Sequence, residues 1–463
     1  PGECIFIKEP TLNKIKKSKS FDYNIKEEFS RIFPQNPNTV LLSNSEISDI
    51  MTDNGAGFIR FADIDITRRS LDMLRRPQGI YTLIKTNGKA LSLSKSPFYN
   101  LSGKHRVEFA TKSVTYFAEN EFVHANICCK IHRTDACEHR ILTVSNIKNE
   151  QLSAEILFYF EPVLSAFRNY DAHFTFSKLF VMSKYNADSK VLLFYRRNRD
   201  DTQHPFLAVS LFDYSDFEFE TKRENLMPSP NGLMGLLDFD KIAFSGKMGT
   251  PDCCCAIKVK KTIEKKSDIK VHFLIAVAKT EQEAVNIIVN ARKEGSIDAV
   301  DCAPSPIIND TIEGRVGNSI LSQLVFYKYD GKQSLAAIKS NTLAQNSLWQ
   351  LGISGDLPIV AVEAEGRLDV SRLEIYIKIQ EYLKLIKFNF DICLIYDSTK
   401  NEEILSDIDR LYEKNQKVFI EQNGLYLIDV NTISDDLVTL IKAAAAHISK
   451  ISMVHLNMPT FEY

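Results

Sequence analysis

The chain has 463 residues, with 57 basic and 59 acidic side chains and a net charge of -2. This length suggests two to four domains, and a hydrophobic fraction of 44% is ordinary for a soluble globular protein. The balanced charge provides no field that attracts a polyanion, which argues against nucleic acid or an anionic membrane as a partner. A neutral or locally recognised ligand fits better.

No apolar stretch has the length of a signal peptide or of a bilayer-spanning helix, which predicts a soluble protein without an export signal. The nine cysteines are an odd number, and Cys253–Cys255 are consecutive, so that their side chains would alternate between the two faces of a strand. This arrangement is poor for disulfides and favours the cytoplasm. We expect no metal site. The residues whose spacing comes closest to that of zinc ligands are Cys128, Cys129, His132 and Cys137. Their cysteines are better interpreted as small buried apolar side chains.

Residues 1–37 are interpreted as an N-terminal extension, and residues 38–300 predict many short strands. Apolar and polar residues alternate in these segments, and turn residues separate them. The clearest helix is Glu281–Lys293, which has an apolar stripe at helical spacing. We expect one large antiparallel sandwich over 38–300, with two smaller sandwiches as the alternative. The predicted strands include Gly79–Lys85, Arg106–Ala110, Ser113–Ala118, Phe122–His132, Glu138–Asn146, Ser153–Pro162, Leu179–Val181, Val191–Arg196, Phe206–Leu211 and Lys270–Ala278.

Residues 301–357 are interpreted as a helical linker, with helical patterns up to about Lys328 and near Ser334–Ile338. From Pro358 strand and helix patterns alternate, which predicts a small mixed α/β unit over residues 358–463. Ser434 is a candidate N-cap of the last helix, because acidic residues follow it. The other elements predicted for this unit are the strands Ile359–Glu363, Asp391–Tyr396, Lys417–Ile420 and Leu425–Asp429 and the helices Val370–Lys387 and Ile404–Tyr412.

No self-sufficient catalytic motif is present. The sequence has no P-loop, no H-E-x-x-H and no G-x-S-x-G, and Gly55-Ala56-Gly57 lacks the third glycine of a dinucleotide-binding loop, so that it is interpreted as a turn. A carboxylate pair for glycoside chemistry is defined by its separation in space and cannot be identified from sequence. We therefore assign no catalytic residue.

Charged and aromatic residues between positions 58 and 81 form the candidate substrate site. One interpretation is a solvated hairpin with surface ion pairs. The other is a sugar-facing loop, because Arg forks and carboxylates suit vicinal hydroxyls, and because Phe58, Phe61 and Tyr81 could stack on a pyranose ring. The candidate substrate-binding residues are Arg60, Asp63, Arg68, Arg69, Asp72 and Tyr81.

A second concentrated segment spans residues 345–358 and contains the single tryptophan, Trp349. Two glycines permit tight turns, Pro358 restricts the residue before it to an extended conformation, and Asp356 can accept from turn amides. We predict a structured loop that leads into a strand, with a structural role and with Trp349 packed in the core or in the linker. The marker residues of this loop are Trp349, Gly352, Ser354, Gly355, Asp356 and Pro358.

Several segments resemble glycoside hydrolase family 94, in particular the 1,2-β-oligoglucan phosphorylases and the phosphorylase-like part of cyclic β-1,2-glucan synthases. The strongest likeness is Leu348-Trp349 with the following Gly-Ile-Ser-Gly-Asp-Leu-Pro. Further matching segments are 52–58, 63–68, 190–208, 231–238, 390–395 and 424–427, and their order and spacing agree with the family. Arg69 departs from the family pattern, in which Trp is more frequent at this position.

The resemblance implies a mainly β fold followed by α/β, namely a galactose-mutarotase-like supersandwich, a helical linker and a small α/β unit, leading to an (α/α)6 barrel that this chain does not contain. It implies the N-terminal, non-catalytic portion of a β-glucan phosphorylase-type enzyme. The implied partners are a β-linked gluco-oligosaccharide and a barrel in cis or from a split gene. Inorganic phosphate would be the co-substrate of the parent enzyme, and no cofactor is implied. The alternatives are a stand-alone carbohydrate-binding subunit and a complete hydrolase that uses carboxylates of the sandwich.

Overall fold

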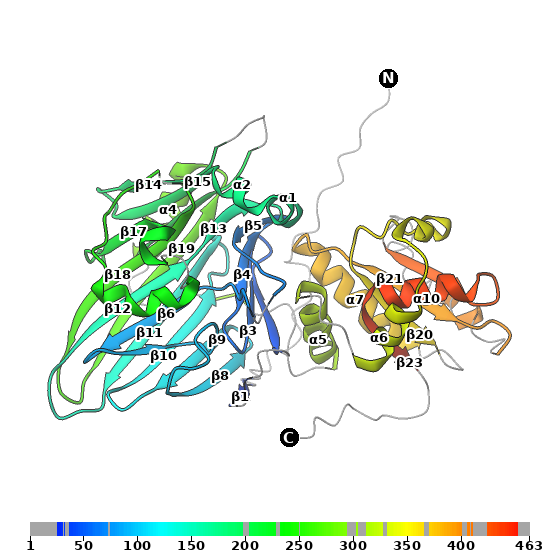
Figure 1. Ribbon diagram of the computed structural model, residues 1–463, viewed down its shortest axis with the longest axis horizontal. Coiled ribbons are helices and arrows are strands. Elements are labelled where there is room, and N and C mark those ends of the chain that lie inside the picture. The colour runs from blue at the N-terminus through cyan, green and yellow to red at the C-terminus, as the bar shows by residue number, and fades with distance from the viewer. Residues whose placement is uncertain are drawn as a thin grey trace.

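The computed structural model has a large β lobe and a smaller α/β lobe, which lie side by side with helix α5 between them (Figure 1). Among the described residues, no helix is long and apolar enough to cross a membrane. The structure describes residues 26–30, 32, 37–72, 75–197, 203–227, 232–249, 251–293, 302–303, 312–326, 331–364, 370–400, 405–407, 409–410 and 424–451.

The main layer of the large lobe is an antiparallel sheet of nine strands within the described ranges. Its strands are long and alternate buried and less buried positions, as in Val123–Ile131, because successive side chains point to opposite faces. In spatial order the strands are β1 (Lys26–Phe29), β8 (Lys104–Ala110), β9 (Ser113–Glu119), β10 (Val123–Ile131), β11 (Cys137–Asn146), β19 (Asp268–Ala278), β16 (Phe206–Leu211), β15 (Val191–Arg196) and β14 (Val181–Asn186).

A second, five-stranded sheet packs against this layer and closes the sandwich. The rings of Phe158 in β12 and Phe273 in β19 stack at 4.3 Å between centroids, and both belong to the largest hydrophobic core. Aromatic contacts of this kind add to the area that the two sheets bury. The strands of the second sheet, in spatial order, are β17 (Glu218–Lys222), β18 (Cys253–Ile263), β12 (Leu152–Phe160), β6 (Tyr81–Thr86) and β7 (Lys89–Ser92).

A third sheet carries the candidate substrate hairpin and faces the smaller lobe (Figure 1). Its strands in spatial order are β13 (Pro162–Ser165), β5 (Ile64–Thr67), β4 (Gly57–Phe61), β3 (Ile47–Thr52) and β2 (Thr39–Ser43). Short helices border the sheets of the large lobe. They are α1 (Phe167–Ala172), α2 (Phe174–Lys178), α3 (Arg223–Leu226), the 3-10 helix η2 (Gly232–Lys241) and α4 (Glu281–Lys293).

The smaller lobe is built on a parallel sheet in the order β22-β21-β20-β23. Parallel strands need crossover connections, and α7 and α10 provide two of them. Ser434 caps α10, since its side chain accepts from the amide of Leu437. The elements of this lobe are β20 (Ile359–Ala364), α7 (Val370–Leu385), β21 (Asp391–Tyr396), β22 (Leu425–Asp429), α10 (Asp435–Ala444) and β23 (Ala445–Ile451), and α5 (Ile312–Phe326), α6 (Gly331–Ser340) and the 3-10 helix η4 (Gln345–Leu351) precede them.

The two lobes share a hydrophobic core cluster. Leu41 and Phe58 from the third sheet of the large lobe pack in one cluster with Leu324 of α5, Leu373 of α7 and Val360 of β20. Each of these side chains is at most 1% exposed. The candidate substrate hairpin is therefore held from behind by the smaller lobe.

The predicted fold class is confirmed, and most predicted strands and the helix Glu281–Lys293 lie where the pattern placed them. Three local predictions differ. Leu179 ends α2, and the strand begins only at Val181; the helices α1 and α2 were not predicted; and β23 follows the last helix. The predicted strand Lys417–Ile420 lies outside the described residues. The predicted helix Ile404–Tyr412 is helical at its described residues, 405–407 and 409–410. The unit boundaries at 37, 300 and 357 stay predictions.

Candidate functional site

Arg60 and Asp65 form a buried ion pair on the hairpin of β4 and β5. Their exposed fractions are 7% and 1%, and Arg60 Nε lies 3.2 Å from Asp65 Oδ1. Burial raises the pKa of Asp65, although Arg69 and Arg60 oppose the rise. The Arg60 guanidinium also lies 5.4 Å from the ring centroid of Phe388 in the smaller lobe. Arg60 thus connects the hairpin to the smaller lobe and is not open to a ligand.

Arg69 is enclosed by aromatic rings. Its guanidinium lies 3.6 Å from the centroid of Phe167 in α1 and 5.0 Å from that of Phe58. Tyr170 of α1 donates to Asp65 Oδ2 at 2.8 Å and accepts from the Arg69 amide at 3.2 Å. The segment containing α1 therefore covers this end of the hairpin through cation–π and hydrogen-bond contacts.

Arg68 belongs to a separate charge network. It donates to Glu161 Oε2 at 2.8 Å and stacks on Phe174 of α2 at 3.6 Å. Lys178 lies 3.7 Å from the same carboxylate oxygen and also pairs with Asp252. Burial alone would raise the pKa of Glu161, but Arg68 and Lys178 outweigh burial and hold that pKa below its usual range. The network fixes α2 to the hairpin.

The remaining hairpin candidates divide into exposed and buried residues. Asp63 and Asp72 are exposed, and Asp72 Oδ1 accepts from the Arg75 amide at 2.8 Å. Tyr81 is only 1% exposed and packs edge-on against Phe98 at 6.2 Å, while Phe58 belongs to the core shared by the lobes. The expectation that Tyr81 and Phe58 stack on a pyranose is therefore wrong in this structure. The alternative of surface ion pairs is also wrong for Arg60 and Asp65.

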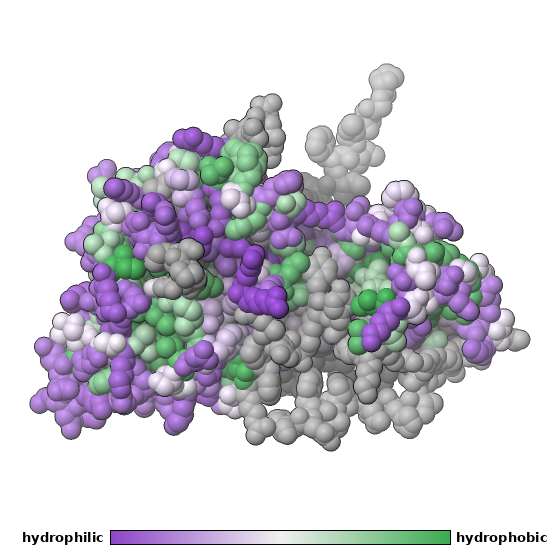
Figure 2. Space-filling view, in the orientation of Figure 1, coloured by the Kyte–Doolittle hydropathy of each residue, from purple (hydrophilic) through white to green (hydrophobic). Residues whose placement is uncertain are grey.

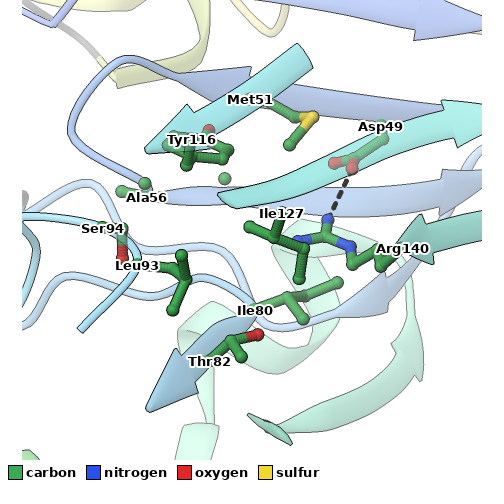
Figure 3. Close-up of a pocket in the computed structure, with 12 residues that line it drawn as sticks. Asp49, Met51, Ala56, Ile80, Thr82, Leu93, Ser94, Tyr116, Ile127 and Arg140 are labelled. Carbon is green, nitrogen blue, oxygen red and sulfur yellow. Dashed lines mark hydrogen bonds and ion pairs between the residues drawn. The ribbon is translucent and has the colours of Figure 1, made fainter. Parts of the chain in front are cut away.

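A buried charge cluster, which the sequence reading missed, lies inside the sandwich (Figure 3). Arg140 of β11 donates to Asp49 of β3 at 2.8 Å and to Glu138 at 2.7 Å. Burial raises the pKa of Glu138, and nearby Asp49 adds to the rise, so that Arg140 does not restore its usual value. Asp49 and Arg140 line a cavity of about 20 Å³, which has room for one water molecule.

The turn after β3 holds another buried carboxyl group with a raised pKa. Asp53 is 1% exposed, and burial raises its pKa to about 7 against the hydrogen bond that Asn38 donates to Oδ2 at 2.8 Å. A general acid needs such a pKa but must also reach its substrate. Because Asp53 is enclosed, we give it no acid role.

No group of three or more His, Cys, Asp or Glu side chains that could hold a metal is found among the described residues. Free thiols in the described residues include those of Cys129, Cys254 and Cys393, and burial raises the pKa of Cys129 well above its usual value. Cys253 and Cys255 lie in the sandwich core, whereas Cys254 lies in a second cluster beneath η2. This alternation follows from their successive positions on β18.

The marker loop differs from its prediction in one respect. Gly352 and Gly355 have φ angles of 73° and 71°, as two glycine turns require, and Leu348 and Ile353 anchor the loop in a core cluster. Trp349, however, is 67% exposed. The expectation that Trp349 packs in the core is wrong, because Leu348 takes the inward position of η4.

The buried cluster of Arg140 had a detectable signal in the sequence. Glu138, His139 and Arg140 are three consecutive polar residues inside a predicted strand, so at least one must point inward. The burial of Arg60 had no comparable signal, because the segment after α7 that contacts it, at Lys387 and Phe388, lies more than 300 positions away in the chain.

The comparison with protein families places this chain in one of them. The profile described as the supersandwich domain of glycosyl hydrolase 94 matches residues 23–294. This range contains the three sheets of the large lobe and α4. The chain therefore belongs to glycosyl hydrolase family 94 through its supersandwich domain.

Among curated proteins, the cyclic β-(1,2)-glucan synthase NdvB of Rhizobium meliloti is 23% identical over 415 residues. The match covers 82% of this chain, whereas the chain spans 14% of the length of that relative.

Solved structures show weaker similarity. A bacterial glucoamylase in complex with acarbose has 11% identity and a TM-score of 0.39, over 60% of this chain and 36% of that one. A galactose mutarotase-like protein from Lactobacillus casei has 9% identity and a TM-score of 0.29, over 52% of this chain and 100% of that one. These scores carry no argument about function.

Proposed function

We propose that this chain is the carbohydrate-binding and assembly portion of a β-glucan phosphorylase-type enzyme and that it carries no catalytic residue. The observation behind the proposal is the family match over residues 23–294. The similarity to a cyclic β-(1,2)-glucan synthase supports a β-linked gluco-oligosaccharide as the ligand. A barrel, in cis or from a split gene, would supply the chemistry, and inorganic phosphate would be its co-substrate.

The state of the buried carboxyl groups supports a non-catalytic role. Inverting chemistry needs one carboxylic acid that faces the glycosidic oxygen while the nucleophile attacks from the opposite side. In the described residues, Asp65 and Glu161 are enclosed and paired with arginine, as are Asp49 and Glu138 in the sandwich. None of these four groups is open to a sugar. The buried free thiols favour the cytoplasm as the location.

The experiment incubates the purified full chain with β-1,2-linked gluco-oligosaccharides, with and without inorganic phosphate. We expect binding by calorimetry, and neither glucose 1-phosphate nor new reducing ends by chromatography. Phosphate-independent sugar release, retained after repeated purification, would establish a complete hydrolase in place of this proposal. The absence of any heat of binding would contradict the carbohydrate-binding part.

A further inference from the structure

The side chain of Trp349 stands out from the surface in a fixed orientation. It is the most exposed of the large hydrophobic side chains in the described residues, at 67%. Its indole N–H donates to the carbonyl of Ser354 at 3.3 Å. Exposing an aromatic ring of this size forgoes a large burial energy. A fixed and exposed indole is therefore available to a ligand that covers it.

The loop beneath the indole is well held. The amides of Gly352 and Ile353 donate to the carbonyls of Trp349 and Leu348 at 3.0 and 3.2 Å. Leu348 and Ile353 are at most 1% exposed and pack against β20 and α10. The ring is thus presented by a rigid support, and binding would cost little ordering of the loop.

Exposed polar side chains lie on the loop that carries the indole. Gln345 donates to the same Ser354 carbonyl at 3.2 Å, and Gln350 is exposed one position after the tryptophan. Asp356 Oδ1 lies 3.6 Å from Arg168 Nη1, so that α1 of the large lobe reaches this loop. Amides and an Arg–Asp pair offer donors and acceptors that suit vicinal hydroxyls.

A groove of about 360 Å³ adjoins the loop. It runs between the end of α6, the marker loop and the end of α10, and its lining includes Ile338, Asn341, Gln345, Leu357 and Ala443. This volume lies at the lower end of ligand-binding sites. In Figure 2 the surface of the smaller lobe mixes hydrophobic and hydrophilic areas.

We propose that the exposed face of the marker loop, formed by Trp349, Gln345, Gln350, Asp356 and Arg168, binds a β-linked gluco-oligosaccharide by stacking the apolar face of one pyranose on the indole. The inference rests on the proposed function and gives it a site. A sugar fits better than a protein partner, because exposed polar side chains accompany a single ring on this loop. The hairpin predicted from sequence has no comparable exposed ring, since Phe58 and Tyr81 are buried.

The test uses the emission of Trp349, the only tryptophan in the chain. The full chain is titrated with β-1,2-linked gluco-oligosaccharides while emission, acrylamide quenching and heat are recorded. Stacking should shift the emission to the blue and reduce quenching by acrylamide. Both changes should saturate at the same sugar concentration as the heat of binding. Trp349→Ala should weaken binding by about tenfold or more, as expected for a central aromatic contact. Trp349→Phe should retain part of the affinity because a flat ring remains.

Tyr214→Ala serves as the matched control, because Tyr214 is an exposed aromatic residue of the large lobe, and it should leave binding unchanged. Heat of binding that Trp349→Ala leaves unaltered would overturn this inference and leave the proposed function standing. The absence of heat with every oligosaccharide would overturn both. A third outcome would favour a protein contact and overturn the inference. In it, the emission shifts to the blue as protein concentration rises without sugar, the oligomeric state changes with it, and Trp349→Ala abolishes that change.

Discussion

Two buried histidines in the large lobe form a hydrogen bond between their rings. His139 of β11 and His272 of β19 lie on adjacent strands, with Nδ1 and Nε2 3.1 Å apart. Phe212 stacks on His272 at 4.7 Å. Burial lowers the pKa of both rings to about 3. His132 lowers the pKa of His139 further, His139 lowers that of His272, and Lys130 acts in the same direction on both. Asp213 acts in the opposite direction on His272. The folded protein therefore keeps both rings neutral.

This pair predicts a loss of stability in acid. The unfolded pKa of histidine is about 6.5, so between about pH 6.5 and 3 the unfolded chain binds more protons than the folded one. The stabilisation is complete above pH 6.5 and is lost as the pH falls towards 3. At pH 5 we expect the pair to cost on the order of 2–4 kcal/mol in unfolding free energy relative to pH 7.5. Urea unfolding at the two pH values measures the difference.

Paired variants isolate the histidines from other groups. Asp53 changes the unfolding free energy with pH in the opposite direction. Its raised pKa of about 7 gives stability that is complete below pH 3.8 and is lost as the pH rises through 7. The double variant His139→Leu/His272→Phe keeps Asp53 and should show a smaller loss in acid. His124→Gln, at an exposed position, should behave like the wild type. An equal acid loss in the double variant would contradict the assignment.

The hairpin of β3 and β4 depends on a close approach of two backbones. A Cβ at Gly57 would lie 2.3 Å from the carbonyl oxygen of Ile50 and 3.1 Å from Met51 Cα. Neither atom is a flexible side-chain end, so the strands would have to move apart. Gly57 also donates to Gln78 at 2.9 Å. The second glycine of the Gly55-Ala56-Gly57 turn is thus required by contact and not by a ligand.

Gly57→Ala should therefore lower the unfolding free energy by about 3 kcal/mol or more, at the upper end of overpacking costs. Gly88→Ala is the matched control, since Gly88 has a φ of 75° but nothing within 4 Å of its added Cβ. It should cost about 1 kcal/mol from backbone strain alone. Thermal unfolding followed by circular dichroism compares the two. A Gly57→Ala variant as stable as Gly88→Ala would contradict the contact argument.

At the scale of elements, the periodicity of apolar residues was sufficient to predict a helix or strand that has one buried face. Glu281–Lys293 and the alternating strands were predicted because apolar residues repeat at the period of their element. The short helices α1 and α2 have few buried residues, and their order comes from contacts with Arg68 and Arg69. The enclosure of Arg68 and Arg69 follows from these helices. It could not be predicted from residues 58–81 alone.

At the scale of the molecule, the cluster shared by the two lobes couples their stability. Leu324 of α5 is 1% exposed in this cluster, together with Phe58 from the large lobe. Separating the lobes would expose both surfaces to water. We therefore expect the lobes to unfold together, although their secondary structure differs.

Two probes test this coupling during urea unfolding. Emission of Trp349 reports on the smaller lobe, and far-ultraviolet circular dichroism includes the strand signal of the large lobe. Their midpoints should coincide. Leu324→Ala should move both together by about 2–5 kcal/mol, whereas Leu335→Ala, at a half-exposed position of α6, should move neither appreciably. Separate midpoints in the wild type would show that the lobes are independent.

The order of large and small units along the chain was predictable, because the pattern changes from period two to alternating strands and helices. Their contact was not, since it joins Leu41 and Phe58 to residues some three hundred positions later. The position of Trp349 was also not predictable. Leu348 and Trp349 are adjacent apolar residues on a 3-10 turn, and sequence does not decide which of them points inward.

The alternating cysteines of β18 also determine how readily oxidants react with the protein. Burial keeps the thiols of Cys253, Cys254 and Cys255 protonated, and a protonated thiol is a poor nucleophile. Peroxide or an alkylating reagent would therefore reach them only when β18 leaves its neighbouring strands. Modification of these three thiols would therefore indicate that the sandwich has opened. Cys254 would report on one face of the sheet, and Cys253 and Cys255 on the other.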